Sequence, residues 1–330
     1  MPLFLELVRQ VSHQDPALAR RALAGLDAYE NAPSAAEPPS RPAVAQVDSA
    51  ALRDHGGDGP PIILIPSLIN PPDVLDLDEE TSLAGALAAA GHRVLLVDWG
   101  QASARAGLSV AGHVETLLLP LLDALGEPAT IVGYCLGGTM AIAAANLTEV
   151  HAVVTLAAPW NFAAYPDNSK RALQNMWSHA EPAARSLGAL PMEVLQAAFW
   201  SLDPERTVRK FAEFGRLDPA GADARRFIEL EEWANEGEPL PYPAAKELVE
   251  ELFGKDFPGS GLWTVGGRAT SAAVEARALH LTAERDFIAP PQTVASGNVV
   301  AIPSGHVGMI VGSARHRLHD ELNAFLTPCR

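Results

Sequence analysis

The stretch ATIVGYCLGGTMAIAAANL, from Ala129 to Leu147, decides the fold. It begins with a short apolar run, turns within GYCLGG, and continues as an apolar segment with the composition of a buried helix. A strand, a sharp turn and a helix in this order are typical of a nucleophile elbow, and here cysteine occupies the position that serine usually takes. We therefore expect Cys135 to be presented at the end of a strand.

The glycines of this turn have a steric role. Gly133 and Gly137 flank the nucleophile where neighbouring backbone segments come too close for a Cβ, and Gly138 eases the packing of the helix. A helix N-terminus also favours the thiolate form of Cys135. Neither a G-x-G-x-x-G fingerprint nor a P-loop is present, so a phosphate cradle is disfavoured, and an inert buried cysteine is the other interpretation.

An elbow nucleophile needs two backbone N–H groups to stabilise the developing oxyanion. The residue after the nucleophile, Leu136, is expected to supply the first. The second is expected from the loop that follows the first core strand, within residues 67–70, and Leu68 is the residue assigned there.

Short apolar runs alternate with helical patterns on both sides of the elbow. This alternation predicts an α/β protein, specifically an α/β-hydrolase fold with a mostly parallel central sheet flanked by helices. The expected strands are residues 61–69, 92–99, 129–135, 151–159, 276–286 and 297–306, and the expected helices between them are 81–90, 111–125 and 138–147, with a last helix at 314–326.

Four regions are expected along the chain. Residues 1–45 read as an N-terminal helical arm and a Pro-rich linker, residues 46–159 as the first part of the core, residues 160–270 as an inserted helical cap, and residues 271–330 as the rest of the core. The cap holds five of the six tryptophans, which can either line a dry channel or pack as a small core of their own.

The base and the acid follow the nucleophile in the chain order that this fold requires. Asp286 ends the strand RALHLTAERD, and His306 lies in the loop IPSGHVG after the next strand. His306 is expected to act as the base, while Asp286 orients its ring. Glu284 and Asp256 compete as the acid, but Glu284 comes earlier on the strand and Asp256 lies in the expected cap.

Composition excludes several classes of function. The net charge of −16 and a pI near 5.0 argue against nucleic-acid and anionic-membrane binding, and no apolar run is long enough to span a bilayer. Two cysteines, Cys135 and Cys329, cannot form a disulfide framework, which favours a reducing, cytoplasmic compartment, and Cys329 receives no role. The acidic run at 73–80 lacks the spacing of a calcium loop, so no metal or cofactor is expected.

With these residues placed, the chain resembles the polyhydroxyalkanoate synthases, which polymerise 3-hydroxyacyl-CoA thioesters. Besides the elbow, the resemblance rests on the segments at residues 65–100, APWNF at 158–162, FWSLDP at 199–204, LEEWANEGEP at 230–239, ERDFIAPP at 284–291 and SGHVGMIVG at 304–312. It implies that Cys135 is the acylated cysteine, Asp286 the acid and His306 the general base. It also implies substrate contacts from the APWNF segment and beside the acid, namely Trp160, Asn161, Phe162 and Phe287.

The length resembles that of the short synthases, which work with a separate helical subunit. The resemblance therefore implies an acyl-CoA substrate, a helical partner subunit or a homodimer, and a location at polyester granules. At the position after the acid, where this family usually has histidine, the chain has Phe287. Two other interpretations stay open: a hydrolase with a cysteine nucleophile (a thioesterase, a polyester depolymerase or a dienelactone-hydrolase-like enzyme), and a non-catalytic granule-associated protein.

Overall fold

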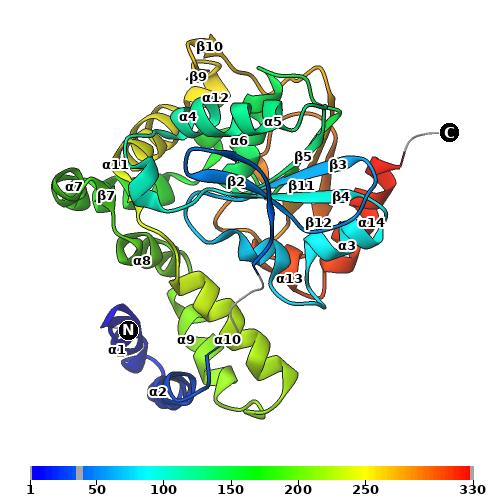
Figure 1. Ribbon diagram of the computed structural model, residues 1–330. Coiled ribbons are helices and arrows are strands. Elements are labelled where there is room, and N and C mark those ends of the chain that lie inside the picture. Colours follow the sequence, from blue (N-terminus) through cyan, green and yellow to red (C-terminus); the bar gives the residue numbers. More distant parts are fainter. Residues whose placement is uncertain (1, 35–39, 328–330) are drawn as a thin grey trace. The chain divides into compact units, whose positions relative to one another are not determined.

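A computed structural model describes residues 2–34 and 40–327 of the chain (Figure 1). Part of the expected linker, residues 35–39, and Cys329 lie outside the described residues. By compactness the chain divides into two units. One comprises Met1–Pro38 and Met192–Gly237, and the other comprises Pro39–Pro191 and Glu238–Arg330.

The larger unit is built on one eight-stranded sheet in the order β1-β2-β4-β3-β5-β6-β11-β12. From β4 to β12 every neighbouring pair is parallel, whereas β1 and β2 add an antiparallel edge. The expected α/β-hydrolase architecture, with a mostly parallel sheet between helices, is thereby confirmed. The strands are β1 (Ala43–Val47), β2 (Ala50–Asp54), β3 (Pro61–Ile65), β4 (Arg93–Asp98), β5 (Thr130–Tyr134), β6 (Ala152–Leu156), β11 (Arg277–Ala283) and β12 (Val299–Ile302).

The central strands consist of apolar residues that are buried on both faces of the sheet. Ile63, Ile131 and Val153 lie on three neighbouring strands, and each has an exposed fraction of 0%. Such strands need helices on both sides to cover them. Figure 1 shows α4, α5 and α6 over one face and α3, α13 and α14 over the other.

The sequence did not predict the hairpin formed by β1 and β2. Val47 pairs with Ala50, so Asp48 and Ser49 form its tight turn, and Asp48 takes a φ of 48°. These strands are short and rich in alanine, which has a low preference for strands, and they therefore carry little local signal.

In the larger unit, α3, the run from α4 to α5, α6 and α14 follow the expected helical segments, whereas η1, η2, η6 and α13 were not predicted. The helices of this unit are η1 (Pro72–Asp76), α3 (Leu83–Ala89), η2 (Ala102–Arg105), α4 (Val110–His113), η3 (Val114–Leu118), α5 (Leu119–Ala124), α6 (Leu136–Ala145), η4 (Phe162–Ala164), α7 (Asp167–Leu187), α11 (Tyr242–Lys246), η5 (Glu247–Phe253), α12 (Phe257–Ser260), η6 (Pro291–Thr293), α13 (Gly308–Val311) and α14 (Arg315–Leu326). Two short ladders, β7 (Ala189–Leu190) with β8 (Leu240–Pro241) and β9 (Thr264–Val265) with β10 (Arg268–Ala269), lie in the same insertion.

The smaller unit is helical and contains both expected N-terminal helices. Phe4 packs against Phe211 with ring centroids 4.5 Å apart, and a Cβ on Gly25 would meet the carbonyl oxygen of Phe211 at 1.8 Å. The backbones of α2 and α9 therefore touch at Gly25. The helices are α1 (Pro2–Ser12), α2 (Pro16–Glu30), α8 (Met192–Leu202), α9 (Pro204–Phe214) and α10 (Ala222–Asn235).

The inserted residues thus belong to two compact units, while the expected boundaries of a cap at 160–270 stay a prediction. Within the larger unit the tryptophans of the insertion pack as core. Trp160 and Trp263 are buried and meet edge to face, with ring centroids 5.9 Å apart. Among the residues that the structure describes, no helix is both long and apolar enough to cross a membrane.

Candidate active site at the carboxyl edge of the sheet

Cys135 lies at the junction of β5 and α6 in a strained conformation. Its φ of 55° and ψ of −128° belong to a region that residues with a Cβ rarely adopt. The turn is held by the backbone, because the Cys135 N–H donates to the carbonyl of Leu156 at 2.9 Å and its own carbonyl accepts from Gly138 N–H at 2.9 Å. The side chain is partly exposed, so the thiol is presented rather than packed away.

The three glycines leave no space for a side chain. A Cβ on Gly133 would lie 2.4 Å from the carbonyl oxygen of Gly137, and one on Gly137 would lie 2.1 Å from that of Ile65. A Cβ on Gly138 would lie 2.3 Å from the Cβ of Ala158. Real Cβ atoms do not approach other atoms so closely, which confirms the predicted steric role of all three glycines.

Asp286 and His306 come from neighbouring strand ends and lie side by side. The Oδ2 atom of Asp286 is 2.7 Å from Nδ1 of His306. The second carboxylate oxygen accepts the backbone N–H groups of Ile288 at 2.8 Å and Ala289 at 2.9 Å. The Asp286 side chain is fully buried, so these bonds hold its carboxylate in one orientation.

Tyr165 supports this turn through a hydrogen bond. Its hydroxyl group donates to the carbonyl of Ile288 at 2.8 Å. Burial, followed by the charges of Cys135 and Asp286, raises the pKa of Tyr165 well above its usual range, so the phenol stays neutral. This contact was not predictable from the sequence, because Tyr165 lies more than a hundred residues before its partner.

His306 has the electrostatic environment of a protonated base. Burial by itself lowers its pKa, but the charges of Asp286 and Cys135 and hydrogen bonds with both side chains raise it from 6.5 to about 10. Cys135 therefore contributes to the electrostatic surroundings of the His306 ring. In such a set of side chains, an imidazole can exchange a proton with a thiol while a carboxylate stabilises the imidazolium.

The two competing acids lie elsewhere. Glu284 is exposed at the end of β11. Asp256 caps α12, and its carboxylate accepts the N–H groups of Phe162 at 2.7 Å and Gly259 at 3.2 Å. Asp256 therefore ties the end of the insertion to the segment that leaves β6.

The expected oxyanion donors come from the elbow itself and from the loop after β3. Leu136 is the first residue of α6, so its N–H is one of those that have no acceptor within the helix. Leu68 is buried in the loop after β3, and the indole N–H of Trp99 holds that loop by donating to the carbonyl of Pro66 at 3.3 Å. Their roles stay predictions.

The four expected substrate contacts differ in accessibility. Trp160 and Phe162 are 2% and 0% exposed and pack in the core, whereas Asn161 is exposed. Phe287, next to the acid, has 57% of its surface exposed. Phe287 and Asn161 are therefore available to a ligand without rearrangement, whereas Trp160 and Phe162 are not.

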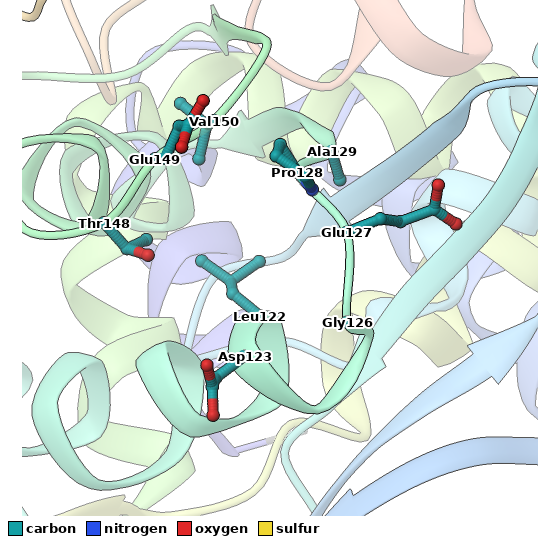
Figure 2. Close-up of a pocket in the computed structure, with 9 residues that line it drawn as sticks. All are labelled: Leu122, Asp123, Gly126, Glu127, Pro128, Ala129, Thr148, Glu149 and Val150. Carbon is teal, nitrogen blue, oxygen red and sulfur yellow. The ribbon is translucent and has the colours of Figure 1, made fainter.

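A cavity of about 220 Å³ lies at the opposite end of β5 (Figure 2). It is lined by residues of the turn that leads into β5, including Glu127 and Ala129, and by residues before β6 such as Glu149. With a rise of about 3.3 Å per residue, six residues of strand separate Ala129 from Cys135 by about 20 Å. This cavity is therefore not part of the candidate active site.

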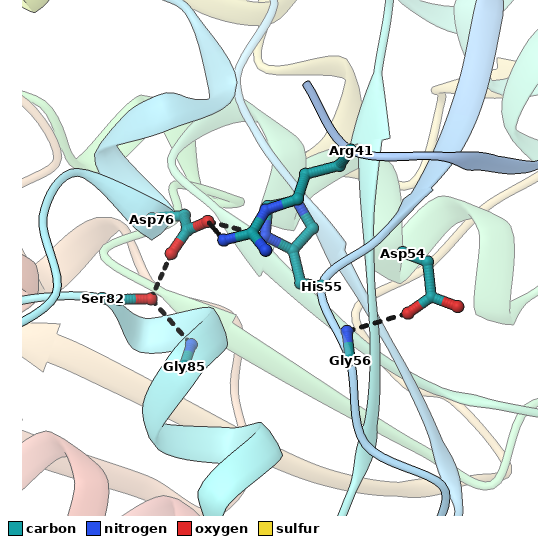
Figure 3. Close-up of polar contacts among 7 residues, drawn as sticks. All are labelled: Arg41, Asp54, His55, Gly56, Asp76, Ser82 and Gly85. Atoms are coloured by element: carbon teal, nitrogen blue, oxygen red, sulfur yellow. Dashed lines mark hydrogen bonds and ion pairs between the residues drawn. The ribbon is translucent and has the colours of Figure 1, made fainter. Parts of the chain in front are cut away.

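A second carboxylate–imidazole pair serves the fold (Figure 3). The Oδ2 atom of Asp76 lies 2.8 Å from Nδ1 of His55 and 3.1 Å from Arg41, and the hydroxyl of Ser82 donates to Oδ1. Burial favours the neutral acid, but the hydrogen bonds from His55 and Ser82 outweigh it and lower the pKa of Asp76. Ser82 also caps α3, so Asp76 joins several separate segments. Within residues 2–34 and 40–327, no cluster of three or more His, Cys, Asp or Glu side chains could hold a metal ion.

The chain is similar to known proteins in sequence and in structure. The sequence model of a family described as "Alpha/beta hydrolase family" matches residues 55–321. A hydrolase of known structure from Pseudomonas aeruginosa PA01 aligns with a TM-score of 0.56 and 18% identity, over 88% of this chain and 98% of that one. At this identity the structural match supports the fold alone.

Two curated relatives carry the name "Poly(3-hydroxyalkanoate) polymerase subunit PhaC". The relative from Haloarcula marismortui is 25% identical over 82% of this chain, and the match covers 61% of its own length. The relative from Thiocystis violacea is 25% identical over 81% of this chain and 80% of its own length. The chain thus spans less than two thirds of the first relative and most of the second.

Proposed function

Since the chain belongs to the alpha/beta hydrolase family, we propose that it uses this fold as an acyltransferase, which polymerises (R)-3-hydroxyacyl-CoA to polyhydroxyalkanoate through a thioester on Cys135. The observation that carries the proposal is the presence of a strained, partly exposed thiol that raises the pKa of an imidazole, which a buried carboxylate orients. The names of the two relatives supply the substrate class.

The first step is an exchange of thioesters. The sulfur of Cys135 attacks the carbonyl carbon of the acyl-CoA, the bond from that carbon to the CoA sulfur breaks, and the acyl group remains on Cys135. The proton that leaves the Cys135 thiol is held by His306 and passes to the departing CoA thiolate. One thioester replaces another, so the step is nearly balanced in free energy, which suits a sulfur nucleophile.

The second step decides between polymer and free acid. The 3-hydroxyl group of another acyl unit gives its proton to His306 and attacks the thioester carbonyl, which forms an ester bond and frees the sulfur of Cys135. Water in the same position would give hydrolysis instead. Asp286 stabilises the imidazolium in both steps, and its two backbone hydrogen bonds keep it in place.

Backbone amides are assigned to the oxyanion. The N–H groups of Leu136 and Leu68 would donate to the carbonyl oxygen of the acyl group as its negative charge develops. Phe287 and Asn161 would meet the acyl chain at the surface, because both are exposed at the same edge of the sheet. Trp160 and Phe162 would then support this surface from within.

The proposal extends to partners and location. A helical synthase subunit or a second copy of the chain would bind it, and the cytoplasmic surface of polyester granules would be its place of work. The word "subunit" in the relatives' name supports a partner, since it implies an assembly of more than one chain.

The proposal is tested with 3-hydroxybutyryl-CoA and the purified full-length chain. We expect rapid release of CoA, an acyl adduct on the peptide that contains Cys135 in mass spectrometry, and insoluble polyester after longer incubation. Cys135→Ala should abolish the adduct and the release, whereas Cys329→Ser should leave both unchanged.

The outcomes separate the competing functions. CoA release with free 3-hydroxybutyrate and no polyester would assign the chain to the hydrolases. Release that persists in Cys135→Ala would exclude the covalent mechanism, and a chain that neither binds an acyl group nor releases CoA would be a non-catalytic member of the family.

A further inference from the structure

Tyr134 lies directly beside the candidate nucleophile and packs on the candidate base. It is the last residue of β5, only 3% exposed, and its ring centroid lies 5.1 Å from that of His306 with 37° between the planes. Aromatic rings at this separation are in contact. His306 is therefore held by a hydrogen bond at Nδ1 and by a tilted contact with an aromatic ring.

The ring of Tyr134, and not its hydroxyl group, makes this contact. The hydroxyl oxygen is buried, and no described residue forms a hydrogen bond with it. A buried polar group without a partner costs about 1–3 kcal/mol, so the hydroxyl does not account for the position of this side chain. Burial, followed by the charges of Cys135 and Asp286, raises the pKa of Tyr134 well above its usual range, and the ring stays neutral.

We propose that Tyr134 is a positioning residue that holds the imidazole of His306 in the plane required for proton exchange with Cys135, through its ring alone. The inference rests on the proposed roles of Cys135 and His306. A single hydrogen bond from His306 to Asp286 does not by itself fix the rotation of the imidazole about its Cβ–Cγ bond. The ring of Tyr134 would restrict this rotation and keep Nε2 directed towards Cys135.

The position of Tyr134 in the chain links the support of His306 directly to the nucleophile. Tyr134 is joined covalently to Cys135, so the side chain that restrains the base moves with the backbone that carries the nucleophile. The backbone of Cys135 is in turn held to β6 by its hydrogen bond to Leu156. A displacement of about 1 Å between reacting groups can cost a hundredfold in rate, so a shared support for both groups matters.

The test measures the reactivity of the Cys135 thiol without any acyl-CoA. In a Cys329→Ser background Cys135 is the only thiol, and its rate of alkylation by iodoacetamide is recorded against pH. Three variants are compared: Tyr134→Phe, which keeps the ring; Tyr134→Met, which keeps bulk without a flat face; and Tyr134→Leu, which provides a second ring-free variant if Met does not fold. His306→Asn gives the rate without the base.

We expect Tyr134→Phe to react within about twofold of the parent and to unfold at an equal or higher temperature, because it removes an unpaired buried hydroxyl. Tyr134→Met should react roughly tenfold to a hundredfold more slowly, with a pH profile displaced towards that of His306→Asn. A purely structural role would lower the unfolding temperature and leave the pH profile in place.

Two results would overturn the proposal. If Tyr134→Met or Tyr134→Leu keeps the parental rate and pH profile, the ring does not position His306. If Tyr134→Phe is as slow as the ring-free variants, the hydroxyl group is required and the role of the ring alone is wrong. Because alkylation needs no acyl-CoA, both results are independent of whether the chain polymerises 3-hydroxyacyl groups.

Discussion

The carboxylate of Asp286 contacts His306 with one oxygen, at 2.7 Å, and its own backbone turn with the other. The turn formed by Ile288 and Ala289 thus orients the acid independently of the histidine. Removal of the imidazole would leave the carboxylate of Asp286 in place. Removal of the negative charge of Asp286 would instead leave the imidazolium without a counter-ion.

Replacement of Asp286 by asparagine should slow acylation without unfolding the chain. Loss of the charge in comparable triads reduces the rate by roughly a hundredfold to ten-thousandfold. Glu284→Gln and Asp256→Asn are matched controls and should stay within about twofold of the parent, because neither carboxylate contacts His306 in the structure. The measurement is the burst of CoA release, and a slow Asp256→Asn with a fast Asp286→Asn would reverse the assignment.

The raised pKa of His306 makes stability depend on pH. A group whose pKa is higher in the folded chain stabilises it fully below the unfolded value, here 6.5, and this contribution disappears as pH rises through the folded value of about 10. The difference in free energy of unfolding between the parent and His306→Asn should therefore shrink from pH 6.5 to about 10. Urea denaturation at several pH values measures this difference. If the free energies of unfolding of the two proteins change in parallel over this pH range, the ion pair is contradicted.

Gly137 should tolerate no side chain. In Gly137→Ala the new Cβ would lie 2.1 Å from the carbonyl oxygen of Ile65, and the backbone would have to move. We expect a loss of about 3 kcal/mol of stability, together with loss of acylation. Gly107→Ala is the matched control, since nothing lies within 4 Å of its added Cβ, and urea denaturation of both variants tests the steric explanation.

Asp76 should contribute to stability and not to catalysis. Asp76→Asn weakens its bonds to His55, Arg41 and Ser82, and we expect a loss of about 1–3 kcal/mol with an unchanged rate of acylation per folded chain. Its lowered pKa means that this contribution is present above pH 3.8 and is lost as pH falls further. Asp54→Asn, whose carboxylate accepts an exposed amide of Gly56 (Figure 3), should change stability less.

The features that the sequence predicted correctly depend on short-range stereochemistry. The elbow was predictable because the spacing of Gly133, Gly137 and Gly138 around Cys135 alone indicates a turn too tight for side chains at these positions. The parallel strands were predictable because apolar runs buried on both faces differ from exposed alternating ones.

The features that escaped prediction depend on contacts between distant residues. The ring contact between Tyr134 and His306 joins residues more than 170 positions apart, and the hydrogen bond from Tyr165 to Ile288 spans 123 positions. The burial of Trp160 and Phe162 follows from the folding of the insertion around them and is not visible in the APWNF motif. The β1–β2 hairpin was missed because its pattern is weak and its stability comes from pairing with β4.

Strand β12, which leads to His306, is four residues long and lies at the edge of the sheet, where it pairs with β11. Edge strands with one neighbour open more readily than central ones, so β12 can fray while β5 and Cys135 stay folded. On warming or in mild denaturant, His306 would then lose its position before Cys135 does. Activity should decay at a lower temperature than the sheet melts, and the protein would fail first as a catalyst and only later as a fold.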